Sequence, residues 1–255
     1  MKRIELGHTG LTVSRLAVGT GTAGWGGSSN QTRKLGVTGL SALLRLAFDL
    51  GVTFWDTADA YGSHQHVADA LRQVGRDNVV ITTKTMASSA ADAERAVERF
   101  LREIGTDHLD VVLLHYMTSA DWPRGHAGAM QALDRLKARG LVRAVGVSCH
   151  DLGALGVAAD HPWVDVVLGR INPAGVNMDG PVDKVLPVLE RAHANGKGVY
   201  GMKILGQGRL GHDAPGAFRF ALGLDCLDAL VVGVESEREL RDDVDHVEKL
   251  DPVRV

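Results

Sequence analysis

The sequence predicts an α/β protein of the (β/α)8 barrel class, folded as a single domain over residues 1–255. Eight short apolar runs alternate with longer segments of helical periodicity. The runs are almost continuously apolar, which is typical of parallel strands that are covered on both faces. No linker, charge block or low-complexity segment divides the 255 residues, and barrels of this length are routinely single domains.

The strands are predicted first, because the apolar runs give the clearest signal. They are expected at residues 15–20, 53–57, 78–84, 109–115, 142–148, 164–169, 198–203 and 229–234. Sequential parallel strands need crossover connections, so each run is expected to lead into a helix.

The helices are predicted from apolar spacing and from their ends. Four helical segments end on a glycine, which is the usual C-terminal signal: Gly51, Gly105, Gly140 and Gly196. The last helix is expected to open at Ser236, with Glu239 three residues on. After the first strand, residues 25–36 are predicted to be a loop, with helical periodicity beginning only near Thr38.

Composition narrows the functional class. The formal net charge is -3, so no global basic field favours nucleic acid or a membrane surface. Two distant cysteines favour a reducing compartment over a disulfide framework. No secretory signal or membrane-spanning run is found. We expect a soluble cytoplasmic protein, and the sequence leaves its oligomeric state open.

One glycine pattern raises a competing fold. Gly19, Gly21 and Gly24 spell G-x-G-x-x-G after an apolar run, which is the spelling of a dinucleotide-binding turn. Such a turn needs a helix opening at the third glycine, and here loop-like sequence follows. A glycine-rich loop above the first barrel strand is therefore favoured over a Rossmann turn.

Four chemically active side chains are predicted to meet at one end of the barrel. Active sites of such barrels lie at the C-terminal ends of the strands. The second strand ends at Asp56, with Tyr61 in its loop, while the third and fourth strands end at Lys84 and His115. Each alone has a structural explanation, as a turn residue, a surface charge or a core histidine. Their joint placement favours catalysis.

The four residue types suit proton donation. A free tyrosine has a pKa of about 10 and is a weak acid at neutral pH. The Lys84 cation is expected to lower the pKa of Tyr61, and Asp56 is expected to keep that lysine charged. A neutral His115 could orient a carbonyl oxygen. General acid catalysis of this kind contributes ~10²–10⁴ in rate.

These residues lie in motifs that resemble the aldo-keto reductases. The stretch FWDTADAYG is similar to the family signature D-T-A-x-x-Y-G, and RIELGHTGLTVSRLAVGT, ITTK, LLH and VGVS fall in the family's order. The resemblance covers nearly the whole chain. It implies that Tyr61 is the proton donor, that Lys84 paired with Asp56 tunes it, and that His115 positions the carbonyl of a small-molecule substrate. A reduced nicotinamide would supply the hydride.

The resemblance also implies where the cofactor binds. The cofactor is NADP(H) by the family's usual preference, with NAD(H) as the alternative, because acids crowd the stretch expected to meet the adenosine. The residues expected at the adenosine end have an alternative explanation, because they could simply form the solvent-exposed face of the last helix. The implied residues are Gly19, Thr20, Asp56, Ser148, Cys149 and Asn172 near the nicotinamide; Met202, Lys203, Leu205, Gly206, Gln207 and Gly208 along the pyrophosphate; and Glu235, Ser236, Arg238, Glu239, Asp242 and Asp243 at the adenosine end.

Several positions depart from the family pattern. Leu168 replaces a glutamine that commonly holds the carboxamide, and Met202 replaces an aromatic residue that stacks on the nicotinamide. These changes support a second hypothesis, a redox-sensing or regulatory protein that binds the cofactor with little turnover. His64 and His66 form an H-x-H pair, which without a third ligand is expected to hold no metal.

Aromatic and sulfur side chains in the loops are expected to line the substrate pocket. Trp55 has an alternative, because neighbours on a strand face opposite ways and it could point into the helix layer. Where relatives commonly carry tryptophan after Gly-Thr, this chain has Gly21, so the pocket wall is expected to be thinner there. The candidate liners are Trp25, Trp55, Tyr116, Met117 and Trp122.

Overall fold

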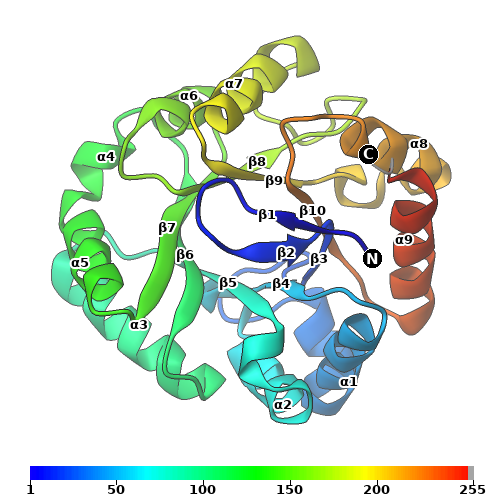
Figure 1. Ribbon diagram of the computed structural model, residues 1–255, viewed down its shortest axis with the longest axis horizontal. Helices are drawn as coiled ribbons and strands as arrows, with labels where there is room; N and C mark the ends of the chain where they lie inside the picture. Colours follow the sequence, from blue (N-terminus) through cyan, green and yellow to red (C-terminus); the bar gives the residue numbers. More distant parts are fainter. Residues whose placement is uncertain (252–255) are drawn as a thin grey trace.

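Eight parallel strands form a closed barrel with helices around it in the computed structural model, which describes residues 1–251 (Figure 1). Each strand pairs with the next in the chain, and the last pairs with the first. The predicted barrel class is therefore confirmed. The barrel strands are β3 (Leu16–Gly19), β4 (Phe54–Asp56), β5 (Val80–Thr85), β6 (Leu109–Met117), β7 (Val142–Cys149), β8 (Val166–Arg170), β9 (Gly198–Met202) and β10 (Ala229–Gly233).

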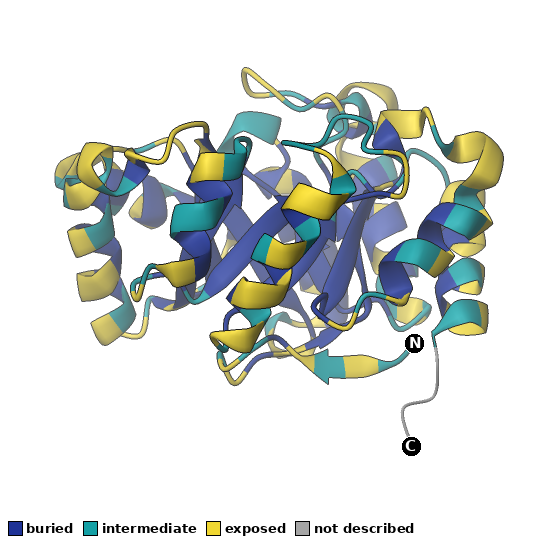
Figure 2. Ribbon diagram, turned by 90° about the horizontal axis from the view of Figure 1, so that it is seen from above, coloured by how far each residue is buried: buried dark blue, intermediate teal, exposed yellow. Residues whose placement is uncertain are grey.

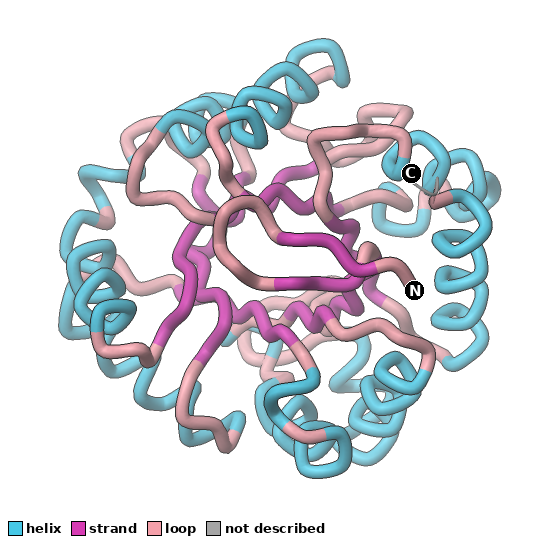
Figure 3. Tube along the Cα trace, in the orientation of Figure 1, coloured by secondary structure: helices cyan, strands magenta, loops and turns pink. Residues whose placement is uncertain are grey.

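An N-terminal hairpin that the apolar pattern did not predict closes one end of the barrel. Strands β1 (Arg3–Glu5) and β2 (Thr12–Ser14) pair antiparallel and lie across the barrel axis (Figures 1 and 3). Leu6, Leu11 and Val13 join the hydrophobic cluster of the barrel interior. The hairpin covers the N-terminal ends of the strands, so the opposite end is the open one.

The helices cover the outside of the barrel, and the four glycine signals mark helix ends. The first helix differs from the prediction: α1 begins at Asn30, because Ser29 and Thr32 form a reciprocal capping box and Gly36, at φ 60°, kinks the helix without ending it. The helices are α1 (Asn30–Asp49), α2 (His64–Val74), α3 (Ala90–Ile104), α4 (Trp122–Gly125), α5 (Ala127–Ala138), α6 (Leu152–Asp160), α7 (Val182–Ala194), α8 (Ala214–Leu222) and α9 (Glu237–Leu250). Within residues 1–251, none of these helices combines the length and apolar character needed to cross a membrane.

Two hydrophobic layers separate the side chains that face the axis from those that face the helices. Figure 2 shows the buried strands enclosed by helices that expose their outer faces. The outer layer holds residues such as Val18, Trp55 and Val145, and the inner layer holds Ala17, Phe54 and Ala144. Because side chains alternate along a strand, position in the strand decides which residues reach the open mouth.

Candidate active site

Asp56 and Lys84 form a buried ion pair at the open end of the barrel. Both face the axis, two residues beyond the inward-facing Phe54 and Thr82. Lys84 Nζ donates to Asp56 Oδ1 at 2.6 Å and to the carbonyl of Thr57 at 2.9 Å. The other Asp56 oxygen accepts from the Tyr200 hydroxyl at 2.9 Å. The carboxylate is thus held from two sides, and it fixes the lysine.

Tyr61 and His115 lie next to this pair. Tyr61 ends a 3-10 turn that starts at Asp59, and Lys84 Nζ lies 5.0 Å from the centre of its ring. The His115 ring meets the Tyr61 ring edge-on, with 5.6 Å between centroids. The structure therefore brings together all four residues expected to act, from three successive strands and one loop.

The electrostatics differ from the expectation in one respect. Burial raises the pKa of Tyr61, and although Lys84 lowers it, the net pKa lies above the ordinary value. Burial lowers the pKa of Lys84, but Asp56 and Tyr61 outweigh burial and raise it overall, so the lysine stays charged. Burial and then the Lys84 cation lower the pKa of His115 to about 3, so this imidazole is neutral at physiological pH.

The burial of Tyr61 comes from the glycine-rich loop after β3. A Cβ atom at Gly21 or at Gly24 would overlap the Tyr61 ring, so the loop backbone lies directly against that ring. No helix opens at Gly24; the chain continues as loop to Asn30. The expectation of a thinner wall at Gly21 is wrong, because the missing side chain is replaced by Tyr61 itself.

An ionic network outside the barrel ties the Tyr61 turn to the strand of Lys84. Arg99 on α3 donates to both oxygens of Asp59 at 2.8 Å and to Glu103 at 3.0 Å. His64 contacts Glu103 at 2.7 Å and the Thr83 hydroxyl at 2.8 Å. Asp59, His64 and Glu103 have ligand atoms within 4.8 Å of one another, but Arg99 already pairs with both acids, so the cluster is explained as an ion-pair network.

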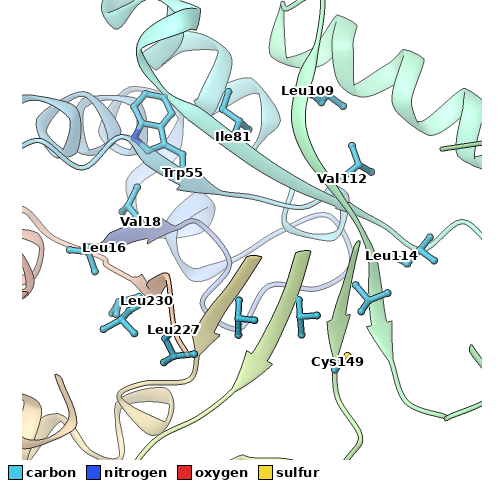
Figure 4. Close-up of a cluster of buried hydrophobic side chains, with 14 of the residues drawn as sticks. Leu16, Val18, Trp55, Ile81, Leu109, Val112, Leu114, Cys149, Leu227 and Leu230 are labelled. Carbon is cyan, nitrogen blue, oxygen red and sulfur yellow. The ribbon is translucent and has the colours of Figure 1, made fainter. Parts of the chain in front are cut away.

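Three of the residues expected near the nicotinamide have their side chains committed elsewhere. The buried Thr20 hydroxyl bonds Ser63 at 2.8 Å and the carbonyl of Asp56 at 3.1 Å. Cys149 faces the helix layer, where burial raises the pKa of its thiol (Figure 4). Asn172 Nδ2 donates to the carbonyls of Val176 at 2.7 Å and Lys203 at 3.1 Å. These side chains are bonded or packed within the scaffold, and their contact with a cofactor stays a prediction.

Gly19 and Ser148 remain at the mouth. Gly19 ends β3 level with Asp56 on the neighbouring strand. Ser148 lies two residues beyond Gly146, level with Leu168 on β8, and its hydroxyl accepts the Tyr116 N–H at 3.0 Å.

The stretch after β9 forms a backbone turn. Met202 packs, half-buried, against the inner cluster, and Lys203 adopts φ 64°. Gly206, Gln207 and Gly208 follow with φ of 55°, 59° and 89°; Leu205 before them packs on the outer layer. The N–H groups of Gly206 and Gly208 donate to the carbonyls of Lys203 and Leu205 at 2.8 and 2.9 Å, so they close the turn on itself.

The residues expected at the adenosine end are mostly paired with one another. Glu235 accepts from Asn30 at 2.7 Å and from Lys34, and its N–H donates to Glu239 at 2.7 Å. Ser236 caps α9, and Arg238 pairs with Asp242 at 3.6 Å.

Asp243, in contrast, is on the buried face of α9 with Leu240, Val244 and Val247. Burial raises its pKa to about 7, with Glu239 and Asp242 adding to the effect. Its side chain is not available to a ligand from the helix surface, so its expected place in the cofactor site is wrong.

Replacing Asp243 with asparagine should stabilise the protein at alkaline pH. The folded-state pKa lies above the ordinary value, so this carboxyl favours folding while protonated, and that advantage is lost as pH rises through about 7. We expect a rise in melting temperature of roughly 2–4 °C at about pH 8, the shift that about 1 kcal/mol gives in a domain of this size, and a smaller rise at about pH 5, which is closer to the ordinary pKa above which the loss begins. Asp245→Asn, at an exposed position on the same helix, is the control; equal shifts at both pH values would contradict the argument.

The expected pocket liners divide into two groups. Trp25 and Tyr116 are exposed at the mouth, with ring centroids 5.8 Å apart. Trp55, Met117 and Trp122 are buried in the outer layer instead (Figure 4). Trp55 and Met117 lie on the outward face of their strands, and the Trp122 indole donates to the carbonyl of Ala154 at 3.3 Å. These three residues do not line the pocket.

Two residues at the mouth were not predicted from the sequence. Arg170 ends β8 two positions after the inward-facing Leu168, and His150 follows β7 two positions after Ser148. The Tyr116 and His150 rings lie 4.3 Å apart. The two-residue alternation, continued past each strand end, is the signal that could have found them.

Comparisons with known proteins agree with this fold. The model of the "Aldo/keto reductase family" matches residues 15–214. The chain is 30% identical over 168 residues to aldo-keto reductase YhdN of Bacillus subtilis, spanning 58% of this chain and 47% of that one. It is 27% identical over 184 residues to the NADH-specific methylglyoxal reductase of Escherichia coli, spanning 63% and 54%; the chain thus matches about half the length of these two relatives. A solved putative aldo-keto reductase from Pseudomonas aeruginosa superposes with a TM-score of 0.82 at 28% identity, covering 97% of this chain and 94% of that one.

Proposed function

The chain belongs to the aldo/keto reductase family, and from that premise we propose that it is an oxidoreductase that reduces aldehyde or ketone carbonyls with a reduced nicotinamide cofactor. The observation that carries the proposal is the contact set of Asp56, Tyr61, Lys84 and His115 at the open end of the barrel.

The proposed reaction assigns one role to each residue. Tyr61 donates a proton to the carbonyl oxygen. Lys84 is charged and close to the phenol, so it stabilises the phenolate that remains. Asp56 holds Lys84 in place, and His115 stays neutral and hydrogen-bonds the carbonyl oxygen. When bound, the cofactor supplies the hydride.

Some of the residues present suit such a cofactor. A Cβ atom at Gly208 would meet open space, so the backbone of this turn leaves room for the close approach of a diphosphate. Ser148 and Met202 lie at the mouth, where a nicotinamide ring would meet Tyr61. Glu235, Ser236 and Arg238 at the start of α9 suit the ribose of an adenosine.

We further propose that NADH is preferred over NADPH, in place of the family's usual choice. Three cations near the start of α9 are already paired: Lys34 with Glu235, Arg238 with Asp242, and Arg241 with Glu237. A carboxylate such as Glu235 favours a ribose hydroxyl over a phosphate.

Glu235→Gln tests this preference, because it should release Lys34 to meet a phosphate. We expect wild-type kcat/KM to favour NADH by about tenfold or more, and the variant to narrow that ratio by about tenfold, equivalent to about 1.4 kcal/mol. Glu98→Gln, an exposed change on α3, is the matched control. A wild-type preference for NADPH would refute the proposal.

The alternative remains a cofactor-binding redox sensor with little turnover. It is favoured by the carboxamide position, where Leu168 is apolar and the amide of Asn172 is already hydrogen-bonded to backbone. Steady-state oxidation of NADH and NADPH across a panel of aldehydes and ketones separates the two functions. Multiple turnovers with at least one carbonyl compound support the reductase, and a single slow turnover with every compound supports the sensor.

A further inference from the structure

The rim of the mouth carries polar groups that the proposed reaction does not use. Arg170 is level with Met202 on the adjacent strand β9, and Lys203 follows directly. His150 joins them, since its ring contacts both Arg170 and Tyr116. Arg170 lies on β8, on the side of the barrel opposite β4, which is the strand that leads into the Tyr61 turn.

The charges of this rim do not balance. Lys84 is matched by Asp56 and Arg170 by Asp179, 3.2 Å away. His150 adds no charge, because burial and then the Arg170 cation lower its pKa to about 2. The Lys203 ammonium makes no hydrogen bond or ion pair with any residue in the range 1–251. Lys203 is therefore a rim cation with no acid paired to it among the described residues.

Lys203 is also held in place at a cost. Its φ of 64° is strained for a residue with a side chain. Two donors fix its carbonyl: the buried Asn172 amide at 3.1 Å and the Gly206 N–H at 2.8 Å. The buried asparagine thus serves to aim this backbone, and the cation with it.

We infer that Arg170 and Lys203 bind a carboxylate carried by the carbonyl substrate, so that the preferred substrates are oxo acids. This inference rests on the proposed reductase function. A guanidinium matches the planar carboxylate, and Arg170 keeps 19% of its side chain exposed. The aromatic side chains of Trp25 and Tyr116 pack against each other, and Tyr116 also packs against His150 beside the cations.

Glyoxylate and methylglyoxal make a matched pair of test substrates, because they differ by a carboxylate oxygen in place of a methyl group. We expect wild-type kcat/KM to favour glyoxylate by about tenfold or more, the effect of one charge-assisted hydrogen bond. Lys203→Met should reduce that ratio by about tenfold, while Lys184→Met, an exposed lysine on α7, should leave it unchanged.

Arg170 needs a paired substitution, because removing it alone would leave Asp179 buried without its cation. Arg170→Met/Asp179→Asn keeps the shape and removes both charges. We expect this variant to keep its melting temperature and to lose the glyoxylate preference.

Two controls separate the possible failures. If Lys203→Met lowers kcat/KM equally for both substrates and weakens NADH binding in a direct titration, Lys203 serves the cofactor and the inference is overturned. A wild-type preference for methylglyoxal over glyoxylate would also overturn it. Binding of oxamate, an unreactive carboxylate, to the protein with NADH is measured by calorimetry. Oxamate binding that Lys203→Met abolishes, in a protein that reduces no carbonyl compound, would support the anion site and reject the reductase.

Discussion

Tyr61→Phe is expected to lower kcat for carbonyl reduction by ~10²–10⁴, the usual contribution of a general acid. The change removes one hydroxyl from a ring that the β3 loop covers, so the packing against Gly21 and Gly24 is kept. Cofactor binding should be nearly unchanged, because the phenol is not part of the proposed diphosphate or ribose contacts. Steady-state kinetics and a fluorescence titration with NADH measure the two effects.

The pH profile is a second test of the same role. Burial keeps the Tyr61 pKa above its ordinary value, so the phenol stays protonated through neutral pH. Wild-type reduction should therefore fall only at strongly alkaline pH, and Tyr61→Phe should lose that alkaline limb. A variant that loses cofactor affinity and activity together would show that Tyr61 is structural.

Lys84→Met is expected to lower stability as well as activity. The lysine is 1% exposed and bonds both Asp56 and the carbonyl of Thr57. Removing it leaves the buried Asp56 carboxylate without its cation, and breaking a buried pair in this way costs about 3–5 kcal/mol. At roughly 2–4 °C per kcal/mol, thermal denaturation should show a fall in melting temperature of about 10 °C.

Lys84→Met/Asp56→Asn is the matched double variant. It removes the uncompensated charge, and the new amide oxygen can still accept the hydrogen bond from Tyr200, so much of the stability should return. Activity should not return, because the Tyr61 phenolate still lacks its cation. Equal melting temperatures for wild type and Lys84→Met would contradict the buried-pair argument.

Much of this fold follows from local rules that a sequence displays. Apolar runs identified all eight barrel strands, because parallel strands are buried on both faces. The hairpin at Arg3–Glu5 and Thr12–Ser14 was missed, since strands of three residues are too short to show periodicity. The start of α1 was missed because threonine, rather than a glutamate or glutamine, completes the capping box at Ser29.

The candidate site could be predicted from the sequence wherever a residue's position along a strand decides where its side chain points. Asp56, Lys84 and His115 lie near strand ends on the inward face, so the barrel topology alone brings them together. Contacts between loops were not predictable. The pKa of Tyr61 depends on how closely the β3 loop covers it, and the commitment of Thr20 to the scaffold depends on tertiary hydrogen bonds. Side-chain alternation also explains why Trp55 faces the helices.

The close packing of the β3 loop on Tyr61 has a consequence for enzyme engineering. In a saturation library, Gly21 and Gly24 should return almost only glycine, since even alanine would displace the ring. Trp25, in the same loop, is 59% exposed and should tolerate wide variation. A directed-evolution campaign to change substrate scope would therefore randomise Trp25 and Tyr116, and would leave the two glycines as parental sequence.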